Sequence, residues 1–166
     1  EIERCLDINL KGVLFGAQAA LPHLKKTAPG SCLLNTASAA GIYGTSGASV
    51  YSATKFGVRA ITESLDAEWA EYGINVRSIM PSFIDTPLIN HNPNDRSNAS
   101  IREQVLSSGL EITPVSEVGE AAWQAVHGDK LHTTVGKTAK RVAFAARWMP
   151  GKMRKEARKR AALGVD

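Results

Sequence analysis

The stretch Ser31-Cys32-Leu33-Leu34-Asn35-Thr36-Ala37-Ser38-Ala39-Ala40-Gly41 decides the fold of this 166-residue chain. Its first seven residues are mostly apolar and follow Pro29-Gly30, a pattern typical of a short buried strand bounded by turns. Ser38 comes directly after that strand, at the position where open α/β sheets bind their ligands. A Gly- and Ser-rich loop then leads to Tyr51-Ser52-Ala53-Thr54-Lys55.

The residues around and after Tyr51 follow a helical period. Between residues 50 and 72, apolar side chains recur every three or four positions, which predicts a helix. A β-branched run at residues 74–80 predicts a second strand, and a third is expected near residues 131–135. Further helices are expected around residues 101–106 and from Ser116 onward. This alternation favours an α/β fold with a parallel sheet.

Tyr51 and Lys55 are four residues apart, so on a helix they lie one above the other. A cation a few ångströms from a phenol favours the phenolate, and the helix N-terminus adds positive potential in the same direction. Such a tyrosine could exchange a proton with an alcohol or an alkoxide near neutral pH. An ordinary surface pair would explain the spacing alone, but the strand-end Ser38 and the loop at residues 81–87 favour the catalytic interpretation.

These motifs together resemble the short-chain dehydrogenase/reductase family, which combines a strand-end Ser-x-x-Gly, a Tyr-x-x-x-Lys helix and a Pro-Gly-x-Ile/Val-x-Thr loop. The resemblance covers residues 1–136. It implies part of a Rossmann-like, doubly wound parallel sheet and an oxidoreductase that uses NAD or NADP. Such an enzyme moves a hydride between nicotinamide and a small-molecule carbonyl or secondary alcohol. The substrate, the direction of reaction and the choice between NAD and NADP stay open.

The resemblance assigns a role to each of four catalytic candidates. Ser38 would orient the substrate carbonyl and Tyr51 would be the general acid/base, so these two residues form the substrate site. Lys55 would favour the phenolate and bind the nicotinamide ribose. Residues 6–12 resemble the family's Asn-bearing helix, in which Asn9 would hold a water that relays protons through the lysine. Alternatively, Asn9 is an ordinary residue that the helix tolerates, and it has no catalytic role.

The loop after the second strand is the expected cofactor contact. The resemblance implies that the backbone of residues 81–84 and the Thr86 hydroxyl hold the nicotinamide carboxamide, although Thr86-Pro87 would also suit a simple turn. Ser82 stands where the family usually has glycine, which narrows the backbone geometry available there. The residues assigned to the cofactor are Tyr51, Lys55, Pro81, Ser82, Ile84 and Thr86.

The chain opens at Glu1 inside an expected helix, and no Gly-x-Gly-x-x-Gly or Gly-x-x-x-Gly-x-Gly loop occurs in it. The resemblance places that phosphate-binding turn upstream, so we expect a C-terminal portion that needs an N-terminal half for activity. A silent chain that acts through assembly is the alternative. In the family the helices that bear Asn9 and Tyr51 pack against their copies, which implies a homo-oligomer. The family's strand order also implies that the first strand here lacks a partner, an exposed edge that invites association.

The tail has a different composition from the rest of the chain. Residues 137–160 contain ten basic residues and one acid, a net charge of +9, whereas residues 1–136 have ten basic and fourteen acidic residues, a net charge of −4. We therefore separate residues 137–166 as a basic amphipathic helical tail. A solvated helix that caps the fold or contacts another subunit is the simplest interpretation, and an anionic membrane surface at residues 137–160 is the alternative. Nucleic acid is disfavoured because no recognition motif or stacking platform is present.

Cysteine and histidine spacing predicts no metal site. Cys5 and Cys32 are far apart, and the four histidines form no His-x-His or His-x-x-x-His pair. Two cysteines in a chain of this class most often remain reduced, so the default location is the cytoplasm. Peripheral association at a membrane surface is the alternative location. No window contains the ~18 to 20 apolar residues that a spanning helix needs.

Overall fold

Three parallel strands organise the residues that the computed structural model describes, 1–92 and 99–162. They are β1 (Cys32–Thr36), β2 (Asn75–Pro81) and β3 (His132–Val135), in the spatial order β1-β2-β3. The register pairs Cys32 with Asn75 and Ser78 with His132. The prediction of an α/β fold with a parallel sheet is confirmed, and each strand begins and ends within one residue of its predicted bounds.

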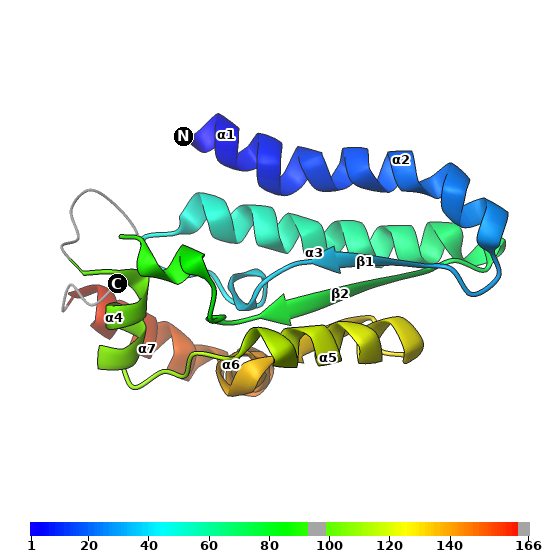
Figure 1. Ribbon diagram of the computed structural model, residues 1–166. Coiled ribbons are helices and arrows are strands. Elements are labelled where there is room, and N and C mark those ends of the chain that lie inside the picture. The colour runs from blue at the N-terminus through cyan, green and yellow to red at the C-terminus, as the bar shows by residue number, and fades with distance from the viewer. Residues whose placement is uncertain (93–98, 163–166) are drawn as a thin grey trace.

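Helices cover both faces of this sheet. Figure 1 shows α2 and α3 on one side of β1 and β2, and α5 on the other. The helical elements are α1 (Ile2–Leu6), η1 (Asp7–Lys11), α2 (Gly12–Thr27), η2 (Ala39–Gly41), α3 (Ser49–Trp69), η3 (Ala70–Tyr72), η4 (Pro87–Asn90), α4 (Ile101–Ser107), α5 (Val115–His127), α6 (Gly136–Trp148) and α7 (Pro150–Ala162). The connection from β1 through α3 to the adjacent parallel β2 is a βαβ unit.

Alternating side chains of the central strand supply apolar packing to both layers. Val76 is fully buried and packs in a cluster with Ala17 of α2 and Trp69 of α3. Ile79 packs on the opposite face with Ala125 of α5. The sheet is therefore sandwiched, and its helices are held mainly by burial of apolar surface.

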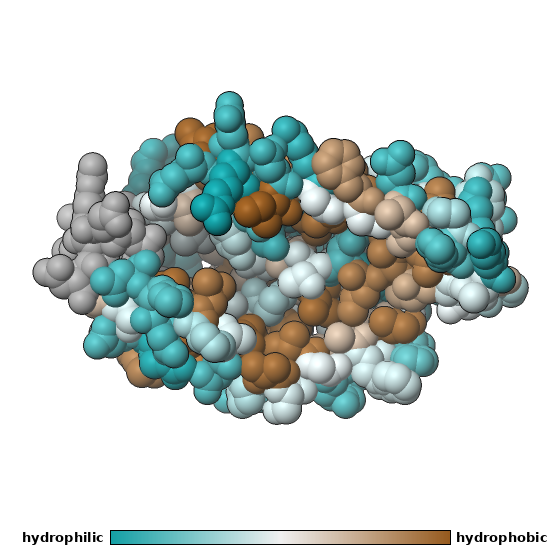
Figure 2. Space-filling model, turned by 45° about the horizontal axis from the view of Figure 1, so that its top comes forward, coloured by the Kyte–Doolittle hydropathy of each residue, from teal (hydrophilic) through white to brown (hydrophobic). Residues whose placement is uncertain are grey.

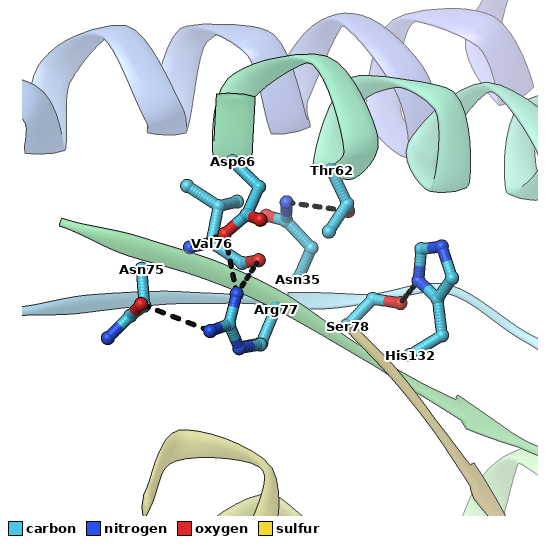
Figure 3. Close-up of polar contacts among 8 residues, drawn as sticks. All are labelled: Asn35, Thr62, Asp66, Asn75, Val76, Arg77, Ser78 and His132. Carbon is cyan, nitrogen blue, oxygen red and sulfur yellow. Dashed lines mark hydrogen bonds and ion pairs between the residues drawn. The ribbon is translucent and has the colours of Figure 1, made fainter. Parts of the chain in front are cut away.

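Polar contacts fasten the sheet to α3, as Figure 3 shows. The side-chain amide of Asn35 donates to Thr62 Oγ1 at 3.1 Å. Ser78 Oγ lies 2.8 Å from His132 Nδ1, and His132 Nε2 lies 2.9 Å from a carboxylate oxygen of Glu63. These bonds join neighbouring strands to α3. They also give the fully buried hydroxyl of Ser78 a hydrogen-bond partner.

Arg77 makes a second set of polar contacts between β2 and α3. Its guanidinium contacts the Asp66 carboxylate at 2.5 Å and the Asn75 side-chain oxygen at 3.0 Å (Figure 3). The Asp66 carboxylate also accepts the backbone N–H of Val76. Because Arg77 is buried, removal of Asp66 would leave a buried charge without its counter-ion, which is costly.

The Glu63 contact predicts a pH dependence of stability. The hydrogen bond with His132 lowers the pKa of the Glu63 carboxyl below its usual 4.5; burial opposes this shift, and the charge of Arg59 adds to it. A carboxyl whose pKa is depressed on folding contributes stability that is fully present above about pH 4.5 and is lost as the pH falls through the folded value. Since the side chain is 48% exposed, we expect a contribution below about 1 kcal/mol.

Urea unfolding at pH 7 and pH 3.5 measures this contribution. Glu63→Gln should lose less stability than the wild type over that interval, whereas Glu68→Gln, an exposed carboxyl on the same helix, should behave as the wild type does. Equal losses for all three proteins would exclude the Glu63–His132 contact as a source of pH dependence.

The first strand is one of the two edges of the described sheet. β1 pairs with β2 on one side, and no other strand of the described residues pairs with it. Unpaired backbone groups on an edge strand are a template for another chain. We therefore predict that the 166-residue chain associates: size-exclusion chromatography should give species larger than a monomer, in proportions that rise with concentration. A monodisperse monomer at all concentrations would contradict this.

The predicted tail contains two helices, α6 and α7, which meet at Met149 and Pro150. α6 follows β3 directly and buries Ala139 against the rest of the molecule. The division of the chain at residue 136 stays a prediction. Within the described residues, no helix is both long enough and apolar enough to cross a bilayer. Residues 93–98, which precede the helix expected around residues 101–106, lie outside the described residues.

Candidate active site

Asn9 lies in a π-helical turn that the sequence did not predict. The turn, η1, runs from Asp7 to Lys11 between two α-helical segments, and such turns occur frequently at functional sites. The Asn9 amide donates to Cys5 Sγ at 3.4 Å. Leu10 packs so closely on α3 that a Cβ at Gly57 would lie 2.5 Å from its Cδ1. Because Gly57 has no side chain, the turn that carries Asn9 packs directly on α3, the helix that carries Tyr51.

Ser38 leaves β1 in extended conformation and caps the short turn η2. Its Oγ accepts the backbone N–H of Ala40 at 3.2 Å and lies 3.5 Å from the Pro81 carbonyl oxygen, to which it donates. A Cβ at Gly41 would lie 2.6 Å from the backbone oxygen of Lys55. The glycine of the Ser-x-x-Gly motif thus allows the turn after β1 to lie directly on α3.

Tyr51 and Lys55 lie near the start of α3, as their spacing predicted. The Tyr51 side chain is 40% exposed, and the Lys55 ammonium lies 5.7 Å from the centre of its ring. Lys55 Nζ donates to the Thr36 carbonyl oxygen at 3.0 Å. This hydrogen bond joins the helix to the last residue of β1, so the ammonium is close to both the strand end and the phenol.

Burial changes the electrostatics of Lys55. Desolvation lowers the pKa of its ammonium below the usual 10.5, and the smaller effect of Cys5 on this pKa is in the opposite direction. A partly desolvated ammonium gains more from a neighbouring anion or hydrogen-bond acceptor than a solvated one does. An ammonium group has three N–H donors, and the Thr36 carbonyl accepts one of them.

A cavity of about 420 Å³ lies between α2 and the open edge of β1. Its lining residues are Ile8, Asn9, Val13, Gly16, Ala17, Leu33, Leu34, Asn35, Thr36 and Lys55. Figure 2 shows a hollow with hydrophobic residues across this face of the molecule. The cavity brings Asn9 and Lys55 together, while Tyr51 and Ser38 are not among its lining residues.

The loop after β2 is held in place by its backbone. Thr113 N–H donates to the Phe83 carbonyl at 2.8 Å, and Asp85 N–H donates to the Thr113 carbonyl at 2.9 Å. The Thr86 hydroxyl lies 3.5 Å from the Ile84 carbonyl oxygen, to which it donates. These bonds fix the backbone of residues 83–86 against the segment that precedes α5.

Ser82 fits this loop without backbone strain, because no described residue other than glycine has a positive φ. Its buried hydroxyl has no hydrogen-bond partner among the described residues and would lie 2.9 Å from a Cβ built on Gly136. The side chain therefore faces the start of α6. Any contact that Ser82 makes with a cofactor would use its backbone.

Sequence patterns missed two residues that organise this region. Arg102 of α4 contacts the Asp85 carboxylate and donates to the Asn90 side-chain oxygen at 2.8 Å, so it ties α4 to the loop. Thr113 holds the same loop through its backbone hydrogen bonds with Phe83 and Asp85. Neither residue belongs to a motif, because each acts through a contact between distant segments.

Gly41→Ala tests the close approach at η2. The added methyl group would meet backbone atoms of Lys55 that cannot move alone, so we expect a loss of about 1–3 kcal/mol in the free energy of unfolding. Gly44→Ala is the matched control, since a Cβ there meets nothing within 4 Å. Urea unfolding of both variants measures this loss of stability. Equal losses in the two variants would show that the contact between Gly41 and Lys55 does not limit packing.

Comparison with known proteins identifies the family. A model of the short chain dehydrogenase family matches residues 1–97, which is more than half of the chain. The chain belongs to the short chain dehydrogenase family. An uncharacterized oxidoreductase of Staphylococcus aureus (strain N315) is 42% identical over 97 residues, which are 58% of this chain and 42% of that protein. One from Staphylococcus epidermidis is 45% identical over 83 residues, 50% of this chain and 36% of that protein. The family resemblance predicted from sequence is confirmed.

Solved structures agree on the fold of this short chain dehydrogenase. A short chain dehydrogenase from Burkholderia cenocepacia, in complex with NADP, has a TM-score of 0.75 at 21% identity; the match covers 92% of this chain and 56% of that one. Levodione reductase has a TM-score of 0.67 at 24% identity, over 84% of this chain and 58% of that one. The matches thus cover between 36% and 58% of the proteins that the chain resembles. At these identities the likeness shows the fold alone.

Proposed function

We propose that this chain carries the proton-transfer half of an oxidoreductase that uses NAD or NADP to interconvert a carbonyl and a secondary alcohol. One observation carries the proposal: Lys55 hydrogen-bonds the end of β1, lines the cavity together with Asn9, and lies 5.7 Å from the Tyr51 ring. A partly desolvated ammonium close to both the phenol and this mostly apolar cavity favours an anion or a hydrogen-bond acceptor in either place.

Each residue has a separate task in the proposed reaction. In the reducing direction, Tyr51 gives its hydroxyl proton to the oxygen of the substrate carbonyl as negative charge develops there. Ser38 donates a hydrogen bond to the same oxygen and orients it. Lys55 stabilises the phenolate that remains, and Asn9 holds a water through which the phenolate recovers a proton. In the oxidising direction the same groups act in reverse.

The residues present suit a nicotinamide cofactor, which supplies or accepts the hydride when it is bound. Lys55 retains N–H donors for ribose hydroxyls beyond the one that Thr36 accepts. The backbone of Pro81, Ser82 and Ile84 and the Thr86 hydroxyl are proposed to hold the carboxamide. The Burkholderia cenocepacia structure in complex with NADP supports this cofactor class.

Activity requires a complete dinucleotide site, because such cofactors are bound mainly through a phosphate-binding turn at a helix N-terminus. The chain covers 42% of the Staphylococcus aureus relative. We therefore propose that these residues work together with a Gly-rich half. A silent chain that acts only through assembly is the alternative, and it predicts no turnover even when that half is supplied.

The proposed assembly is a homo-oligomer through the helices that bear Asn9 and Tyr51. The exposed apolar side chains there support it: Ile8 and Phe15 on the first helical segments are 61% and 65% exposed, and Phe56 on α3 is 41% exposed. Apolar side chains that gather on neighbouring helices mark interaction surfaces.

Tyr51→Phe in an enzyme that contains residues 1–166 and a dinucleotide-binding half tests the chemistry. Removal of the phenolic proton donor should lower kcat by about 10²–10⁴-fold, while cofactor binding persists. Tyr72→Phe is the matched control: Tyr72 also has a lysine ammonium over its ring, from Lys25 at 3.4 Å, but it lies in η3, beyond the end of α3 that is remote from Tyr51. A Tyr51→Phe enzyme with near wild-type kcat would show that the proton comes from elsewhere.

A further inference from the structure

The helix α6 exposes its largest apolar side chains. Its buried residues are small: Ala139 is fully buried, and Ala143 and Ala146 are half-buried. Phe144 and Trp148, by contrast, are 58% and 65% exposed. An amphipathic helix on a folded domain normally buries its large apolar residues and exposes its polar ones. α6 exposes its cations in this way, but it also exposes its two largest apolar residues, which the packing of the described residues does not explain.

The two aromatic side chains share the outer face with cations. The exposed residues of α6 are Lys137, Lys140, Arg141, Phe144, Arg147 and Trp148. They follow one another at intervals of three or one, the spacing of a single helical face. The Arg147 guanidinium lies 5.3 Å from the Trp148 ring, so charge and aromatic surface are in direct contact. Four cations and no acid project from this stripe.

The orientation of this face is fixed by the other end of the helix. Backbone N–H groups of Lys137 and Thr138 donate to the Glu111 carboxylate, the second at 3.2 Å. A Cβ at Gly136 would lie 2.6 Å from Thr113 Oγ1, so the helix begins in close contact with the loop that follows α4. With its first turn and Ala139 held, α6 cannot rotate to bury Phe144 without losing these contacts.

The charge of the surroundings selects the partner. α7 adds Lys152, Arg154, Lys155, Arg158 and Lys159, all exposed, against the single acid Glu156. A second copy of this chain would bring like charges together, which disfavours a symmetric contact through α6. The partner must therefore be anionic and must also accept apolar rings. An anionic phospholipid surface meets both conditions, because Trp and Phe partition into the headgroup boundary while Lys and Arg contact the phosphates.

We propose that the outer face of α6, extended by the cations of α7, docks on an anionic phospholipid bilayer, with Phe144 and Trp148 inserted at the headgroup boundary. Figure 1 places α6 and α7 on the opposite side of the sheet from α1 and α2. Docking therefore leaves the cavity that Asn9 and Lys55 line free of the bilayer. The proposal is independent of the proposed chemistry, since it uses none of the catalytic candidates.

Vesicle flotation of the 166-residue chain tests the proposal. Flotation is preferable to sedimentation because protein aggregates sediment but do not float. Vesicles of phosphatidylcholine with 30% phosphatidylserine should carry the protein upward at low salt, and vesicles of pure phosphatidylcholine should not. Binding should fall at least about tenfold when the salt is raised from 0.05 to 0.5 M.

Two variants separate the contributions, each with a matched control. Phe144→Ala/Trp148→Ala should lower vesicle binding about tenfold or more, whereas Trp123→Ala, at an aromatic residue 64% exposed on α5, should leave it unchanged. Lys140→Glu/Arg141→Glu should abolish binding, whereas Arg4→Glu/Lys26→Glu makes the same change of net charge on exposed residues elsewhere and should have little effect.

Three results would overturn the proposal. They are absence of flotation at low salt, equal losses in the α6 variants and their controls, and vesicle binding that ignores Phe144→Ala/Trp148→Ala. Complete competition by a short DNA duplex, with DNA binding that is likewise insensitive to the aromatic substitutions, would assign the face to nucleic acid instead. All variants alter exposed side chains, and circular dichroism verifies that they are folded.

Discussion

The absence of a side chain at Gly41 is the constraint on which the site depends. Because no Cβ is present, the turn after β1 lies directly on the backbone of Lys55, where a methyl group would approach to 2.6 Å. The strand end that carries Ser38 and the helix that carries Tyr51 are thereby brought together. Gly57 acts in the same way between α3 and the turn that carries Asn9. Two glycines therefore position three segments of the site.

Lys55 unites these segments electrostatically. Its long side chain reaches from α3 to the Thr36 carbonyl and loses part of its hydration on the way. A desolvated charge next to a cavity is unfavourable until an acceptor or an anion is present. In the proposed reaction, the same residue would stabilise the phenolate beside it and would offer its remaining N–H donors to a ribose.

Among the surfaces that the described residues leave uncovered, the free side of β1 and the outer face of α6 differ in physical kind. The free side of β1 presents unpaired backbone groups beside an apolar hollow, so it suits a further strand. The outer face of α6 presents aromatic rings among cations, so it suits an anionic surface that also accepts apolar groups. A partner of the first surface would bind mainly through backbone hydrogen bonds. A partner of the second would bind through charge and through partial insertion of the aromatic rings.

The sequence by itself determined the strands, the helix of Tyr51 and Lys55, and the family, because turns, periodicity and motifs are local signals. Residues 31–37 and 74–80 were predicted as strands, and the structure has Cys32–Thr36 and Asn75–Pro81. Only the tertiary structure decided that Asn9 lies in a π-helical turn, that Ser82 faces Gly136, that Arg102 and Thr113 hold the loop, and that Phe144 and Trp148 are exposed. Each of these depends on contacts between segments far apart in the chain, which local patterns do not encode.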